Sequence, residues 1–184
     1  MHRQILFIHG GGLETYEEDK QLAMYLQNAL GSSYKVRYPQ MPNADTPEYQ
    51  LWRAQIDEEF ATLDDGLILI GHSLGGSMLL KYLSEEQSTK SIAGLFLLAP
   101  PYWGGDEDWQ AAEYMLQEDF ATRLPSIPHT FLYHSRDDAV VPFAHLTLYA
   151  EKLPHATIRE FADRGHQFKN NLSEVVEDIK QHMS

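Results

Sequence analysis

The stretch GLILIGHSLGG, residues 66–76, restricts the fold of this chain more than any other. Its apolar run, residues 67–70, has the length and continuity of a buried strand and stops at a serine between glycines. A strand that turns sharply into a helix at Ser73 leaves no room for side chains two residues before or after it, and Gly71 and Gly75 have none. The pattern therefore predicts a strand, a tight turn that projects the Ser73 hydroxyl, and a buried helix.

Apolar runs of strand length recur along the chain, with helical patterns between them. Several runs are continuous, which is typical of strands covered on both faces. Strands that alternate with helices favour right-handed crossovers and the mostly parallel sheet of an α/β protein. The predicted strands span residues 5–8, 34–38, 67–70, 92–99, 130–134 and 157–161.

The clearest predicted helix follows Thr46 and Pro47, which suit the N-cap and the first helical position. Two more helical stripes begin near Pro142 and Leu172. The one long irregular region, residues 100–129, has room for one or two short helices. The apolar stripe of the first helix consists of Tyr49, Trp52, Ile56, Phe60 and Leu63.

Composition excludes several classes of protein. The 184 residues suit one domain, 1–184, and no apolar stretch approaches the ~20 residues that span a bilayer. Without cysteine the chain has no disulfide, thiolate metal site or cysteine nucleophile. The net charge of −13 disfavours binding to nucleic acid or to an anionic membrane. No signal-peptide pattern is present, so we expect a cytoplasmic protein. Its expected partner is a small molecule rather than nucleic acid or a membrane.

A glycine-rich loop follows the first predicted strand, in the sequence His-Gly-Gly-Gly at residues 9–12. Acyl transfer through a serine needs two fixed N–H donors where negative charge develops on the carbonyl oxygen. Leu74 can supply one, and Gly11, or Gly12 as second choice, can supply the other. A phosphate loop is disfavoured because Thr15 replaces the last glycine of that motif and acidic residues follow. A plain glycine turn remains the alternative.

The base and acid that a serine nucleophile requires are available late in the chain. Asp137 and Asp138 follow one apolar strand, and His166 follows the last one. The order serine, aspartate, histidine suits a strand-to-helix serine elbow. Ser73 would attack, His166 would transfer the proton, and Asp138 would orient the imidazole. The alternative is that Asp138 only caps the helix near Pro142.

The remaining histidines give no sign of a metal site, because none has the His-Glu-x-x-His spacing. His72 belongs to the elbow, and its side chain should face away from the nucleophile. The four that we expect to be structural or exposed are His129, His134, His145 and His155.

Together these residues resemble the α/β-hydrolase superfamily, and most of all the small serine hydrolases related to retinoblastoma-binding protein 9. The matching segments are residues 9–12, 71–76, 138–142 and 165–166, in the order of that family. The resemblance implies a three-layer α/β-hydrolase fold, a sheet ordered 2-1-3-4-5-6, carboxylic-ester-hydrolase chemistry and no cofactor. It also favours Asp138 over Asp137, because the aspartate usually stands three residues before the valine of a Val-Pro pair.

Larger relatives of that superfamily often carry a cap domain where this chain has only residues 100–128, a minimal cap. We expect Tyr102 and Trp103 to line an acyl or alcohol pocket beside Ser73, with packing of the loop onto the sheet as the alternative. The nearby acidic residues 106–108 suit a solvated face.

Three functions remain open from the sequence. The first is a serine hydrolase that cleaves carboxylic esters, or thioesters or amides, through an acyl-enzyme. The second is a binding protein that retains this fold but turns over little substrate. The third is acyl transfer or perhydrolysis with the same triad.

Overall fold

The structure, a computed structural model, describes residues 2–86 and 89–183 and has six parallel strands in one sheet. The sheet order is β2-β1-β3-β4-β5-β6, as predicted, and every neighbouring pair is parallel. This order is the one that the resemblance implies. The strands are β1 (Arg3–Ile8), β2 (Tyr34–Arg37), β3 (Leu67–His72), β4 (Ile92–Leu98), β5 (Thr130–Ser135) and β6 (Thr157–Phe161).

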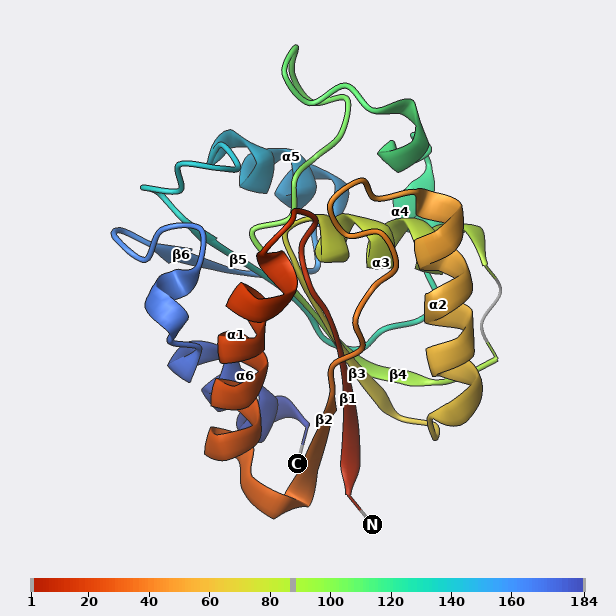
Figure 1. Ribbon diagram of the computed structural model, residues 1–184, viewed down its shortest axis with the longest axis vertical. Helices are drawn as coiled ribbons and strands as arrows, with labels where there is room; N and C mark the ends of the chain where they lie inside the picture. Colours follow the sequence, from red (N-terminus) through yellow and green to blue (C-terminus); the bar gives the residue numbers. More distant parts are fainter. Residues whose placement is uncertain (1, 87–88, 184) are drawn as a thin grey trace.

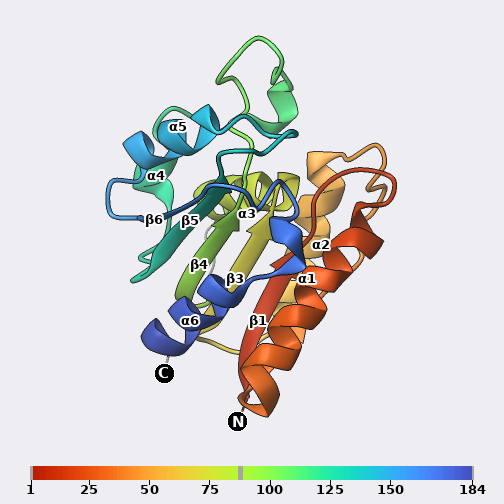
Figure 2. The same ribbon diagram turned by 90° about the vertical axis from the view of Figure 1, so that its left-hand side faces the viewer.

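Helices cover both faces of the sheet and make three layers (Figures 1 and 2). Helices α1 and α6 pack on one face, while α2, α3, α4 and α5 pack on the other. The helices are α1 (Thr15–Leu30), α2 (Tyr49–Thr62), α3 (Leu74–Glu85), α4 (Phe120–Arg123), α5 (Ala144–Lys152) and α6 (Ser173–His182). Three short 3-10 turns are η1 (Gly31–Ser33), η2 (Ala112–Tyr114) and η3 (Phe168–Asn170).

Alternation along the strands builds two separate cores. In β3, Leu67 and Leu69 pack towards α2 and α3, and Ile68 and Ile70 pack towards α1 and α6. All four side chains are fully buried, as expected for a strand covered on both faces. This packing holds β3 rigidly, and its carboxyl end carries Ser73.

The predicted start of α2 is wrong by two residues. The helix begins at Tyr49 rather than Pro47, and Thr46 lies in a turn where its N–H donates to the carbonyl of Asn43. The free N–H of Tyr49 donates instead to a carboxylate oxygen of Glu113, at 3.0 Å. A residue distant in sequence therefore caps this helix, which no local pattern could reveal.

The segment between β4 and β5 contains only η2 and α4, as expected for a minimal cap. Its first part, up to η2, rises above the carboxyl ends of the strands, at the top of Figure 1. The segment thereby covers the edge of the sheet where β3 turns into α3.

Candidate active site

Ser73 occupies a strained turn between β3 and α3. Its φ of 51° and ψ of −125° lie in a region that residues with side chains rarely adopt. Its N–H donates to the carbonyl of Leu98 on β4 at 2.8 Å, which ties the turn to the neighbouring strand. The serine side chain is half-buried at the carboxyl edge of the sheet.

The glycines around Ser73 are sterically required, for two different reasons. A Cβ on Gly71 would lie 2.5 Å from the Cα of Gly76, a clash inside the turn itself. A Cβ on Gly75 would lie 2.3 Å from the carbonyl oxygen of Ile8 at the end of β1. The first clash follows from the local pattern, whereas the second depends on how closely α3 approaches β1.

The N–H groups of the three glycines after β1 have different surroundings. The N–H of Gly10 donates to Oδ2 of Asp19 at 2.9 Å. The N–H of Gly12 donates to the carbonyl of Ala44 at 2.6 Å. Among the described residues no acceptor faces the N–H of Gly11. The structure therefore distinguishes Gly11 from Gly12, the second choice from sequence.

Gly11 lies against the first turn of α3. A Cβ on Gly11 would be 2.6 Å from Cδ2 of Leu74, the residue that follows Ser73. Leu74 is the first residue of α3, so its N–H has no partner within the helix. Gly11, Ser73 and Leu74 line the same cavity.

Asp138 and His166 are in direct contact at the same edge of the sheet. Nδ1 of His166 donates to Oδ2 of Asp138 at 2.8 Å. Oδ1 of Asp138 accepts the N–H groups of Val140 and Val141 at 2.8 and 2.9 Å. Burial favours a higher pKa for Asp138, but hydrogen bonds from His134 and His166 hold that pKa well below its usual value. The carboxylate is therefore ionised and fixed in orientation.

Asp137 faces a different partner. Its Oδ1 accepts the hydroxyl of Ser135 at 2.5 Å and the N–H of Gly165 at 2.8 Å. These bonds, above all the one from the hydroxyl of Ser135, lower the pKa of Asp137. Asp137 therefore anchors the loop that carries His166, while Asp138 contacts the imidazole.

The two nitrogens of the His166 imidazole differ in their contacts. Burial lowers its pKa, the nearby His72 lowers it further, and the hydrogen bond to Asp138 opposes both. No hydrogen bond joins Nε2 of His166 or the Ser73 hydroxyl to another group in residues 2–86 and 89–183. The carbonyl of His166 accepts Nε2–H of His72, the neighbour of Ser73, at 2.9 Å. The histidine loop is thus tied to the serine turn through His72.

A cavity of about 280 Å³ lies beside Ser73. Trp103 lines it, as predicted from the sequence, whereas Tyr102 is not among the lining residues. The ring of Tyr102 packs at 4.9 Å from that of Tyr149 on α5. The complete lining is Gly11, Gly12, Asp45, Pro47, Ser73, Leu74, Pro101, Trp103, Trp109, Tyr114 and Val140.

An aromatic cluster from the cap segment forms one wall of this cavity. The ring of Trp103 meets those of Trp109 and Tyr114 edge to face, each at a centroid distance of 4.9 Å. The hydroxyl of Tyr114 donates to the carbonyl of Pro47, which joins the cap to the chain before α2. The indole N–H of Trp103 is buried without a hydrogen-bond partner among the described residues.

The cap segment is held down by a buried histidine of α5. Nε2 of His145 contacts Oδ2 of Asp106 at 2.8 Å, and its Nδ1 accepts the N–H of Tyr102 at 2.8 Å. His145 is structural, as expected. Residues 106–108 are exposed, as expected for a solvated face, and Asp106 also bonds His145 from that face.

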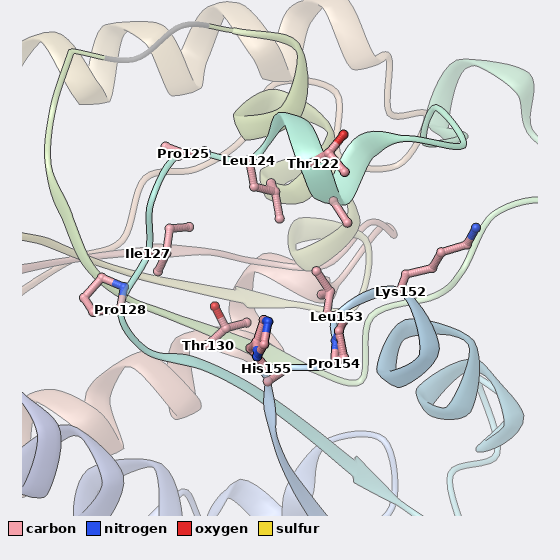
Figure 3. A pocket seen from close by; sticks show the side chains of 12 residues that line it. Thr122, Leu124, Pro125, Ile127, Pro128, Thr130, Lys152, Leu153, Pro154 and His155 are labelled. Atoms are coloured by element: carbon pink, nitrogen blue, oxygen red, sulfur yellow. The ribbon is translucent and has the colours of Figure 1, made fainter.

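A larger cavity, of about 430 Å³, lies at the opposite end of the sheet (Figure 3). It is lined by residues around α4, the start of β5 and the turn between α5 and β6, among them Leu124, Ile127 and Leu153. These segments are at the amino ends of the strands, whereas Ser73 is at a carboxyl end. The larger cavity is therefore separate from the candidate active site.

Residues 2–86 and 89–183 contain no group of three acidic or histidine side chains that could hold a metal ion. Within the same residues, no helix has the length and apolar character to cross a membrane.

Sequence reasoning missed the role of Asp19. It stands in a run of acidic residues, yet its side chain is completely buried. It contacts Gly10, His72 and Gln167, three neighbours of the candidate site. A signal was present, because Asp19 precedes Leu22, Ala23, Leu26 and Leu30 at helical spacing and so occupies the apolar stripe of α1.

Comparison with known proteins places the chain in a family. The sequence profile of the serine hydrolases matches residues 11–172. YdeN of Bacillus subtilis is 24% identical over 172 residues, covering 90% of this chain and 86% of YdeN. The rat (Rattus norvegicus) serine hydrolase RBBP9 is 27% identical over 143 residues, covering 76% of this chain and 73% of RBBP9.

Solved structures show the same fold. The crystal structure of YdeN superposes with a TM-score of 0.78 at 21% identity over 98% of both chains. The meta-cleavage product hydrolase CumD of Pseudomonas fluorescens gives a TM-score of 0.75 at 15% identity, over 97% of this chain and 91% of CumD. The resemblance inferred from the sequence is confirmed, and the chain belongs to the serine hydrolase family, with the α/β-hydrolase fold.

Proposed function

We propose that this serine hydrolase cleaves small carboxylic esters through an acyl-enzyme, with Ser73 as nucleophile, His166 as acid and base, and Asp138 as the orienting acid. The observation that carries the proposal is the 2.8 Å contact between Nδ1 of His166 and the buried carboxylate of Asp138. That contact leaves Nε2 of His166 as the nitrogen available to exchange protons beside the serine turn.

In the first half-reaction, Oγ of Ser73 attacks the acyl carbon while Nε2 of His166 takes the hydroxyl proton. The oxyanion accepts the N–H groups of Gly11 and Leu74, which have no protein acceptor in the described chain. The bond between the acyl carbon and the alcohol oxygen then breaks, and His166 returns the proton to the departing alcohol. The hydrogen bond between Ser73 and His166 forms in the substrate complex, where such contacts tighten.

In the second half-reaction, water attacks the acyl carbon and loses a proton to Nε2 of His166. The bond to Oγ of Ser73 breaks, the carboxylic acid departs, and the proton returns to the serine. Asp138 remains ionised throughout and stabilises the imidazolium that forms twice per turnover.

The cavity favours compact acyl groups. A volume of about 280 Å³ is at the lower end of ligand pockets, and the wall of Trp103, Trp109 and Tyr114 is aromatic. Val140 adds an exposed apolar side chain to the lining. We therefore expect short or aromatic acyl esters to react faster than long-chain ones.

A fluorophosphonate probe, followed by a panel of p-nitrophenyl esters of increasing acyl length, tests the proposal. The wild type should be labelled covalently and should hydrolyse the short esters, whereas Ser73→Ala should do neither. Ser84→Ala, in the same helix but outside the cavity, is the matched control and should retain both activities. A folded wild type that resists labelling would support a binding protein instead, and ester exchange favoured over hydrolysis would support an acyl transferase.

A further inference from the structure

We propose that Asp19 and His72 are positioning residues, which together hold the oxyanion loop, the serine turn and the histidine loop in one arrangement. The inference rests on the proposed function, because it assigns a role relative to Ser73, His166 and Gly11. Neither residue touches the reacting atoms.

Asp19 lies at the centre of three connections. It projects from α1, with no exposed side-chain surface. Its Oδ2 accepts the N–H of Gly10 at 2.9 Å and contacts Nδ1 of His72 at 2.8 Å. Its Oδ1 accepts the side-chain amide of Gln167 at 2.8 Å. One carboxylate thus reaches the glycine loop, the end of β3 and the loop of the catalytic histidine.

His72 extends the connection. It is the last residue of β3 and directly precedes Ser73. Its Nε2 donates to the carbonyl of His166 at 2.9 Å, and the two rings are 4.8 Å apart. The pair therefore bonds Gly10, the neighbour of Gly11, and His166, while His72 itself is the neighbour of Ser73.

The hydrogen-bond partners define the charge of the pair. A carbonyl only accepts, so the Nε2 that faces His166 carries a proton. Asp19 accepts the N–H of Gly10 and the side-chain amide of Gln167, and its pKa is lowered, so the carboxylate is ionised. Nδ1 of His72, 2.8 Å from that carboxylate, must then carry a second proton. His72 is then an imidazolium. Burial favours a lower pKa for His72 and a higher one for Asp19, yet their mutual attraction raises the former and lowers the latter.

A buried ion pair is weak support for stability, because desolvation opposes the attraction between the charges. Its geometry here serves another purpose. The glycine loop, the serine turn and the histidine loop meet at a single carboxylate, and displacement of a reacting group by about 1 Å can slow a reaction by about 10²-fold. Loss of the pair should therefore lower the rate of the chemical step more than it weakens substrate binding.

The test compares Asp19→Ala with Asp19→Asn. We expect Asp19→Ala to lower kcat by about 10²-fold, with KM changed less than about threefold, because the segments shift while the cavity persists. Asp19→Asn retains hydrogen-bonding groups at the same place, so its kcat should be about tenfold higher than that of Asp19→Ala. Rates are measured per correctly folded molecule, well below the unfolding temperature of each variant.

Asp178→Asn is the matched control. Asp178 is also buried, and it bonds Tyr133 and Arg159 on the outer strands rather than the cavity. It should lower Tm and leave kcat within about twofold of the wild type. If Asp19→Ala fails to fold, Asp19→Asn decides alone, with an expected loss of about tenfold in kcat.

A kcat within twofold of the wild type in the folded Asp19 variants would overturn the positioning role. A loss confined to Tm would do the same. Failure of the proposed function looks different, because the wild type would then escape labelling or Ser73→Ala would remain active. Labelled wild type with indifferent Asp19 variants would reject the positioning role alone.

Discussion

Two pairs of a histidine and a carboxylate flank Ser73, and their chemistry differs although their contact distances do not. In both pairs Nδ1 of the imidazole lies 2.8 Å from an aspartate oxygen. The side chain of His166 is 16% exposed, and its Nε2 has no hydrogen-bond partner in the described residues. The side chain of His72 is 1% exposed, and both of its nitrogens make hydrogen bonds. Access to the second nitrogen separates a group that can exchange protons with substrate from one that can only hold its neighbours.

The pKa shifts of the two histidines have opposite signs. Burial lowers the pKa of His166, which favours the neutral imidazole that a general base requires. The ion pair with Asp19 raises the pKa of His72, which keeps its charge. The same residue type at adjacent places is therefore set to opposite protonation states by its surroundings.

The largest expected effect comes from replacing His166, the histidine that exchanges protons. His166→Gln should lower kcat by about 10⁵–10⁶-fold, because His72, the other imidazole beside the serine, has both nitrogens engaged. Steady-state hydrolysis of a short p-nitrophenyl ester measures it, with Asp19→Asn as the comparison at about a tenfold loss. Comparable losses in both variants would show that the two pairs are not functionally distinct.

The next effect concerns the two adjacent aspartates. Asp138→Asn should lower kcat by about 10⁴-fold, because the wrong tautomer of His166 is then favoured. Asp137→Asn should have a much smaller effect, since Asp137 bonds Ser135 and the backbone of Gly165 rather than the imidazole. The same ester assay on both variants decides, and the opposite order would reassign the orienting acid to Asp137.

A smaller effect is expected outside both pairs. Trp103→Ala removes part of the aromatic wall and should shift the ratio of kcat/KM between short and longer acyl esters by about tenfold, in favour of the longer ones. Tm should change little, because Trp103 is only partly buried. An equal loss on all esters with a large fall in Tm would assign Trp103 to packing alone.

The smallest effect is on the pH profile, and it sharpens the comparison directly. kcat/KM should rise with pH as His166 loses its proton, with a midpoint below 6.5 because its pKa is lowered. Histidine NMR should show His72 still protonated at that midpoint, because its pKa is raised. The titratable groups that face the two rings are His9, Asp19 and Asp138. Rings that titrate together, or in the reverse order, would contradict the assignment.

Much of the fold was predictable because its causes are local. The six predicted strands match the observed ones to within two residues at either end, since continuous apolar runs follow from burial on both faces. The turn at Ser73 was predictable from Gly71, whose missing side chain avoids a clash within the same turn. The start of α2 was not, because Glu113 rather than Thr46 satisfies its first N–H.

The candidate site divides in the same way. The sequence order of Ser73, Asp138 and His166 was enough to nominate them, because the carboxyl ends of parallel strands meet at one edge. From the sequence, Tyr102 and Trp103 were equal candidates for lining the cavity. In the structure Trp103 lines it, whereas Tyr102 packs against Tyr149.

By itself, the sequence determined the α/β architecture, the serine turn and the residue types available for acyl transfer, because periodicity and glycine sterics act over a few residues. Only the tertiary structure decided that Asp138 rather than Asp137 meets the imidazole, and that Asp19 is buried against His72. Both contacts join an imidazole nitrogen to a carboxylate oxygen of a segment distant in the sequence, so no local pattern specifies them. The neighbours in space then set the protonation state of each imidazole.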